Sequence, residues 1–239
     1  MKFILSNTVL GFAAGSALVL LVQYARMAAT SPPEIRRAWS WTFGMLGLLL
    51  ATVGFHTIVA WPLIGAGNLI FGDPALVGGG LLLAAAFVVA RTPVEAAPDD
   101  LTDDELGASG SVEDLPAELA VALRPLAWVA AFAGLMVILL GWAGGLFSTY
   151  VFRPPASEFP AGLLAGTGLE IVYMVGTYTL LGVGAILFPF SLERRSLRRP
   201  TAYLFVVSGV LILLITMASF VGHVTLSAGA GPGGLAWPP

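Results

Sequence analysis

The residues best suited to chemistry in this chain are two histidines and one acidic residue, all set in apolar sequence. His56 and His223 are its two histidines, and Glu170 interrupts a further apolar run. Ionisable side chains inside a bilayer are costly, so they are functional candidates by default. Neutral imidazole and carboxylate suit copper, iron or zinc, and histidines on two helices could ligate haem b from both faces. We therefore predict that His56, His223 and Glu170 bind a transition metal or haem.

Other polar and aromatic residues are placed to support these three. Thr167, Glu170 and Thr177 have i, i+3, i+10 spacing with Tyr173 between them, which predicts one helical stripe. Polar stripes of this kind face the helix bundle or a wet cavity rather than lipid. Six residues are expected to support the ligands or line the pocket: Trp61, Asn68, Asp73, Thr167, Tyr173 and Ser219.

A structural interpretation competes with each of these assignments. Asp73-Pro74 is typical of an N-cap followed by a first-turn proline. Asn68 would satisfy the backbone of an irregular segment, and the histidines would bond to neighbouring helices. No H-x-x-x-H or E-x-x-H pair is present, so the metal hypothesis depends on topology alone. The absence of cysteine excludes thiolate ligands and disulfides.

Composition indicates an all-α, polytopic membrane protein. Hydrophobic residues make up 57% of the 239 residues, charged residues make up 10%, and the mean hydropathy is +0.90. A soluble domain carries about 25% charged residues. Apolar runs of about 20 residues are long enough to cross the bilayer as helices. The bilayer is therefore the expected partner, and no basic patch with interleaved aromatics indicates nucleic acid.

The apolar runs and the breakers between them predict six transmembrane helices. Their expected ranges are 7–27, 38–61, 74–90, 125–150, 161–188 and 201–226. An irregular extracytoplasmic segment, 62–73, would join the second and third helices, where prolines and glycines break the pattern. We expect 92–124 to form an acidic cytoplasmic connector and 229–239 a flexible extracytoplasmic tail. The whole chain, 1–239, would be one transmembrane domain.

The basic residues predict the orientation of these helices in the plasma membrane. Nine of the eleven fall on one side of a six-helix topology, whereas Lys2 and Arg153 fall on the other. The positive-inside rule then places both termini outside the cell. In that topology His56 lies about 7 Å below the outer end of its helix, and Glu170 lies about nine residues into its own. The two histidines and the acid would meet in the outer half of the membrane.

The segment around Trp61 resembles a known membrane family. His56-Thr57, Trp61-Pro62-Leu63, Asn68, Phe71-Gly72-Asp73-Pro74 and Gly78 carry the likeness, over about residues 54–83. They are similar to an uncharacterised integral membrane family of bacteria and archaea, domain of unknown function 981. The resemblance implies a membrane location and a shared centre at this segment, and it implies no activity.

Three functions remain open from the sequence, and it does not decide whether the protein is an enzyme. The first is a metal- or haem-binding protein, in which the pocket serves a subunit of a redox or oxidase-like membrane complex. The second is a small permease in which Glu170 couples protons or binds a cation. The third is a structural accessory subunit of a larger membrane assembly, whose polar residues only join helices.

Overall fold

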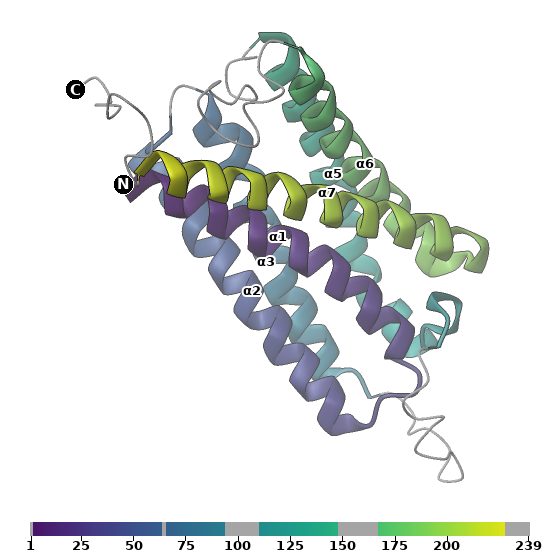
Figure 1. Ribbon diagram of the computed structural model, residues 1–239. Helices are drawn as coiled ribbons and strands as arrows, with labels where there is room; N and C mark the ends of the chain where they lie inside the picture. Colours follow the sequence, from purple (N-terminus) through teal and green to yellow (C-terminus); the bar gives the residue numbers. More distant parts are fainter. Residues whose placement is uncertain (1, 64–65, 94–109, 148–166, 228–239) are drawn as a thin grey trace.

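Six long helices make up most of the computed structural model (Figure 1), which describes residues 2–63, 66–93, 110–147 and 167–227. Side chains 2–7 and 223–227 lie outside this description. The helices are α1 (Lys2–Met27), α2 (Pro33–Ala60), α3 (Gly67–Arg91), α5 (Ala117–Phe147), α6 (Leu169–Glu193) and α7 (Arg195–Ser227), with a short 3-10 helix, η1 (Val112–Asp114). No strand occurs in the described ranges. The predicted all-α fold with six transmembrane helices is confirmed.

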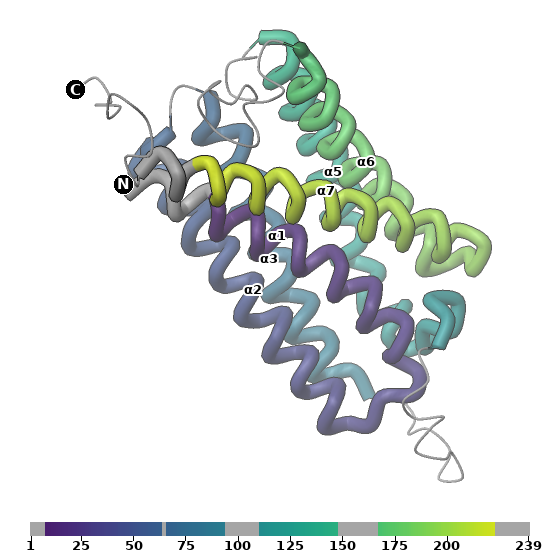
Figure 2. Tube along the Cα trace, in the orientation of Figure 1, coloured from purple at the N-terminus to yellow at the C-terminus, as the bar shows by residue number. Residues whose placement is uncertain are grey.

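The six long helices form a closed ring in chain order. Each helix packs against the next, and α7 returns to lie along α1 (Figure 2). The most extensive contacts fall within three pairs: α2 with α3, α5 with α6, and α1 with α7. Contacts between the pairs are less extensive. The ring is therefore built from three tight helix pairs with a looser centre.

Facing glycines bring the helices of each pair together. A Cβ on Gly15 would lie 2.7 Å from the carbonyl oxygen of Gly209, and one on Gly209 would lie 2.8 Å from that of Gly15. Gly134 faces the carbonyl of Gly182 at 2.6 Å in the same way. The α2–α3 pair has Gly47 against Gly79 and Gly54 against Gly72. Lipid tails are as apolar as the helix side chains, so the hydrophobic effect does not drive helices together inside a membrane. Close van der Waals packing at small residues drives their association instead.

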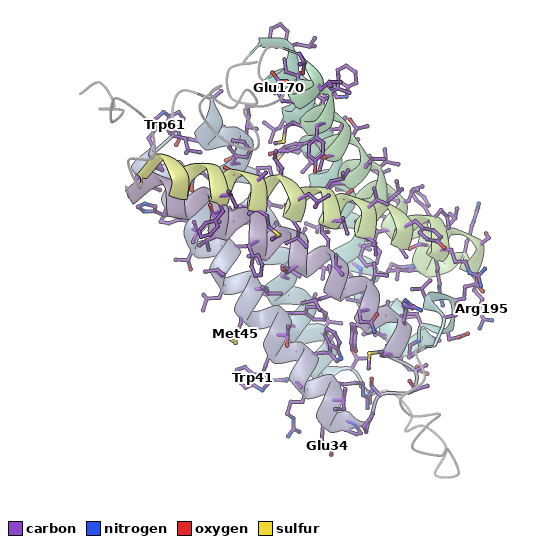
Figure 3. The ribbon with its side chains drawn as sticks, in the orientation of Figure 1. Glu34, Trp41, Met45, Trp61, Glu170 and Arg195 are labelled. Carbon is purple, nitrogen blue, oxygen red and sulfur yellow. The ribbon has the colours of Figure 1, made fainter. Side chains whose placement is uncertain are left out.

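The outer surface of the ring is apolar. Trp41 and Met45 project outward from α2 (Figure 3), with 71% and 72% of their surface exposed. Phe132 on α5 and Met217 on α7 are similarly exposed. Each of the six helices is long and apolar enough to span a membrane. The exposed apolar side chains therefore contact lipid, and the chain is a multi-pass membrane protein.

Several helix boundaries differ from those expected. The helix expected at 74–90 begins at Gly67, so Asp73 and Pro74 lie inside α3 and the N-cap interpretation of Asp73 is wrong. Proline removes one intrahelical hydrogen bond without ending the helix, because neighbouring helices can satisfy the freed carbonyl. α5 begins at Ala117 rather than near residue 125. The expected range 92–124 thus includes η1 and the first turns of α5.

Candidate functional site

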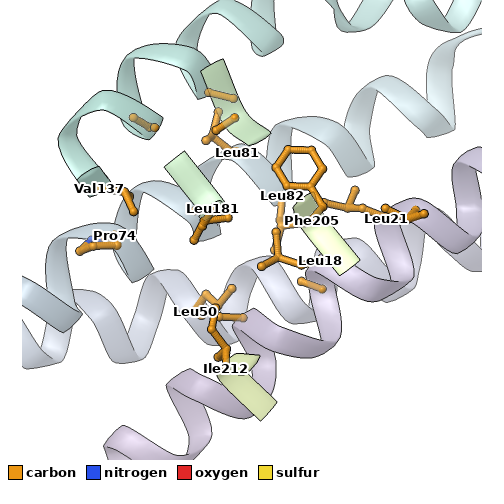
Figure 4. A pocket seen from close by; sticks show the side chains of 18 of the residues that line it. Leu18, Leu21, Leu50, Pro74, Leu81, Leu82, Val137, Leu181, Phe205 and Ile212 are labelled. Atoms are coloured by element: carbon orange, nitrogen blue, oxygen red, sulfur yellow. The ribbon is translucent and has the colours of Figure 1, made fainter. Parts of the chain in front are cut away.

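A central cavity of about 780 Å³ lies inside the ring. All six long helices contribute to its lining, which is mainly apolar (Figure 4). Leu18, Leu50, Leu82, Leu181 and Phe205 are among the apolar side chains that line it. Well-packed protein interiors contain few voids larger than a water molecule, whereas ligand sites occupy about 300–1,000 Å³. The size of this cavity therefore fits a ligand site rather than a packing defect.

One end of the cavity contains Glu170, whose side chain is 3% exposed. Glu170 lies in the first turn of α6, two residues after the left-handed Gly168, and so not nine residues into the helix as expected. The Thr167 hydroxyl donates to Glu170 Oε2 at 3.4 Å and accepts from the Leu169 N–H at 3.2 Å. A carboxylate at a helix N-terminus interacts favourably with the helix dipole. This position lowers the cost of burying the charge.

Two further predicted residues line the same cavity as Glu170. The Tyr173 hydroxyl donates to the Leu211 carbonyl of α7 at 2.5 Å, which joins α6 to α7. Ser219 lies on α7 and also lines the cavity. The structure therefore brings Glu170, Tyr173 and Ser219 to one cavity. We call this the glutamate end; Trp61 lies at the same end of the molecule (Figure 3).

The opposite end of the cavity contains Arg198, at the start of α7. We call it the arginine end; Glu34 and Arg195 also lie at this end of the molecule (Figure 3). The Arg198 guanidinium donates to the carbonyls of Ser191 at 3.2 Å, Glu113 at 2.6 Å and Leu115 at 3.2 Å. These bonds join α6, α7 and the η1 segment around one positive charge.

A tyrosine crosses the ring where a proline interrupts α3. Pro74 has no N–H, so the Ile70 carbonyl four residues earlier loses its intrahelical donor. The Tyr178 hydroxyl of α6 donates to that carbonyl at 2.9 Å. Both Pro74 and Tyr178 line the cavity. The bond links the α2–α3 pair to the α5–α6 pair.

Four other predicted residues, Asn68, Trp61, His56 and Asp73, lie away from the cavity lining. Asn68 is fully buried and bonds twice to Leu63: it accepts from the Leu63 N–H at 2.7 Å and donates to the Leu63 carbonyl at 2.7 Å. This is the role that the structural interpretation gave it. Trp61 ends α2 in a left-handed conformation with φ 49°. His56 is exposed on α2, and Asp73 is partly buried within α3.

The metal site is not tested by these observations. Within the described residues, no three His, Asp or Glu side chains lie close enough to hold a metal ion. The side chain of His223 lies outside the described residues, although its backbone belongs to α7. The ligand set His56, His223 and Glu170 therefore stays a prediction, as does the supporting role of Trp61, Asn68 and Asp73.

A family model described as "Protein of unknown function (DUF981)" matches residues 1–225. The chain belongs to this family. The match confirms the resemblance noted around Trp61 and extends it over most of the chain. No curated protein and no solved structure matches the chain. Since the function of the DUF981 family is unknown, the activity of this member has to be inferred from its cavity.

Sequence reasoning missed the residues of the arginine end and the tyrosine crossing. In the sequence, Arg198 and its neighbours indicate only the topology, as basic residues on one side of the membrane. Tyr178 carried a usable signal, because a proline inside an apolar run frees a carbonyl that needs a donor from another helix. Thr201 carried no comparable signal. Its place in the cavity wall depends on how α7 packs against the rest of the ring.

Proposed function

We propose that this protein binds an elongated apolar molecule, a lipid-like hydrocarbon chain, in the central cavity. The observation that carries the proposal is a largely apolar cavity of about 780 Å³ that is lined by all six helices. Hydrocarbon is the most abundant small apolar material available to a protein in a bilayer. A binding site for it needs volume and apolar walls rather than a cluster of catalytic groups.

The length of the cavity supports an extended occupant. Its lining on α6 runs from Glu170 to Leu192, a rise of about 33 Å at 1.5 Å per residue. A cavity of this length suits a hydrocarbon chain better than a compact solute.

Two glycines that lie two residues apart, on opposite faces of α3, allow a controlled test. Gly78 lines the cavity, and a side chain added there meets nothing within 4 Å. Gly80 also has open space within 4 Å, but it is exposed on the outside of α3. Gly78→Phe should therefore fill the cavity, whereas Gly80→Phe should leave it open.

The experiment is photolabelling of the purified full chain in detergent with a hexadecanol analogue that carries a diazirine in its tail. We expect wild type and Gly80→Phe to form a one-to-one adduct at cavity residues, as seen by intact mass and peptide mapping. In Gly78→Phe, most of this labelling at cavity residues should be lost. Equal labelling of Gly78→Phe and Gly80→Phe, or labelling confined to the outer surface, would refute the proposal.

Coupled transport is a second candidate, favoured by the burial of Glu170 in the cavity wall. A buried carboxylate that exchanges a proton could couple its charge to movement through the ring. This candidate predicts proton flux into voltage-clamped proteoliposomes, measured with an enclosed pH-sensitive dye. Glu170→Gln should abolish the flux, and Glu193→Gln, which removes an exposed carboxylate paired with Arg124, should not. Equal flux in both variants would exclude coupling by Glu170.

We also propose the orientation given by the positive-inside rule, with the arginine end in the cytoplasm of a plasma-membrane protein. Successive helices run in opposite directions through the membrane. The ends that lie on the side of the arginine end carry four of the basic residues: Arg26, Arg91, Arg124 and Arg195. A periplasmic alkaline phosphatase fused after the last residue should then be active, and a fluorescent protein folded in the cytoplasm should be dark at the same position. The opposite pair of signals would reverse the orientation.

A further inference from the structure

We infer that the arginine end of the cavity is a binding site for an anionic oxygen head group, a carboxylate or phosphate, on the hydrocarbon chain. The inference rests on the proposed lipid-binding function and names the class of molecule bound. Arg198 supplies the charge and Thr201 a hydroxyl, and both line the cavity. The apolar middle of the cavity would hold the tail.

The positive charge of Arg198 is fixed in place by neutral groups. Arg198 donates three hydrogen bonds, to the carbonyl oxygens of Ser191, Glu113 and Leu115, which orient the guanidinium without cancelling its charge. The carboxylate of Glu113 pairs instead with Arg199 at 2.8 Å. Among the described residues, no carboxylate lies within salt-bridge distance of Arg198. Arginine recognises carboxylate and phosphate well because its planar guanidinium presents several donors at once.

Thr201 is the second, independent observation. Its side chain is 3% exposed, and its Oγ1 has no hydrogen-bond partner in the described part of the chain. Other buried threonines of the ring, such as Thr177 and Thr216, donate to the carbonyl four residues earlier. Buried hydroxyls without a partner are unusual and costly. A ligand oxygen at the end of the cavity would accept this hydrogen bond.

The two residues are placed to act together. Arg198 and Thr201 are three residues apart on α7 and therefore lie on one helical face. Tyr24, near the C-terminal end of α1, also lines the cavity. Its phenol is a further donor group contributed by a second helix. The charged groups around Arg198 are Glu113 and Asp114 of η1 and Arg195 of its own helix, α7.

Four ligands that differ in head group but share a sixteen-carbon chain test the inference. The probes are hexadecyl phosphate, palmitate, hexadecanol and hexadecyltrimethylammonium, each competing with the diazirine hexadecanol on the full chain. We expect the two anions to compete about tenfold better than hexadecanol, the scale of one charge-assisted hydrogen bond. Inorganic phosphate alone should not compete at equal concentration, since it lacks the tail. Competition by inorganic phosphate equal to that of hexadecyl phosphate would show a free-anion site and overturn the lipid head-group assignment.

Variants separate recognition from folding. Thr201→Val removes a hydroxyl that makes no protein hydrogen bond, so it should lower the anion preference several-fold with an unchanged unfolding midpoint. Arg198→Gln should abolish the preference, and Arg198→Lys should restore part of it. Arg199→Gln is the control, because that side chain is exposed, pairs with Glu113 and does not line the cavity.

The outcomes distinguish this inference from the proposed function. If the hexadecanol probe labels the cavity and the four competitors act equally well, the proposed lipid binding is supported and the anionic head-group site is refuted. The same preference in wild type, Thr201→Val and Arg198→Gln would also refute it. Loss of all labelling in wild type would refute both.

Discussion

The bond from Tyr178 to the Ile70 carbonyl gives the sharpest prediction for stability. Tyr178→Phe keeps the aromatic side chain and removes the hydroxyl that donates to the Ile70 carbonyl, which Pro74 leaves without an intrahelical donor. A buried acceptor left without a donor costs about 1–3 kcal/mol, whereas hydrogen bonds between membrane helices average about 0.6 and reach about 1.7 kcal/mol. Because this carbonyl has lost its intrahelical donor, we expect a cost near the upper membrane value, about 1–2 kcal/mol.

A double-mutant cycle tests the reason as well as the size. In Pro74→Ala, residue 74 regains an N–H that can bond to the Ile70 carbonyl, so Tyr178→Phe should then cost less than about 0.5 kcal/mol. The coupling between the two positions should be about 1 kcal/mol. Tyr203→Phe is a matched control, because Tyr203 is 70% exposed and should change stability by less than about 0.5 kcal/mol.

The assay is reversible unfolding of the purified protein in mixed dodecylmaltoside and SDS micelles, followed by far-UV circular dichroism and tryptophan fluorescence. The free energy of unfolding is compared among wild type, Tyr178→Phe, Pro74→Ala and the double variant. Equal costs of Tyr178→Phe with and without Pro74 would refute the argument that the tyrosine compensates for the proline. A cost no greater than that of Tyr203→Phe would refute the bond itself.

Two further predictions concern packing and the α2–α3 connection. Gly15→Ala would place a Cβ 2.7 Å from the Gly209 carbonyl oxygen, so it should lower the unfolding free energy by about 1–3 kcal/mol. Gly80→Ala, in open space, should raise it by about 0.5–1 kcal/mol in the same unfolding titration, and equal effects would contradict the close approach. Asn68→Ala removes two hydrogen bonds from a fully buried side chain and should cost about 2 kcal/mol. The exposed His56→Ala should cost less than about 0.5 kcal/mol, and similar losses for both would contradict the structural role of Asn68.

Much of the fold was predictable from the sequence because it depends on one-dimensional properties. The six apolar runs predict six spans, since a bilayer requires about 20 apolar residues for each helix. The errors came where local signals compete with tertiary contacts. Asp73-Pro74 has the local chemistry of a helix start, yet α3 continues through it, because Tyr178 supplies the donor that the proline removes.

The candidate site was predictable only in part. Glu170, Tyr173 and Ser219, singled out as polar residues in apolar helices, line the cavity, and their binding roles stay predictions. His56 instead lies exposed on α2, and Asn68 is bonded to the backbone of Leu63. The periodicity of one helix gives the residues that share a face. It does not give the direction in which that face points within a ring of six.

The sequence by itself determined that this is a six-span helical membrane protein, and it also determined which side of the bundle carries the arginines. Hydropathy and charge act on each segment separately, so a linear sequence expresses them fully. Only the tertiary structure decided that the helices close into a ring and that Glu170 and Arg198 lie at opposite ends of one apolar cavity. Those features depend on which glycines face one another across helix pairs, and that is a property of the packed molecule rather than of any segment.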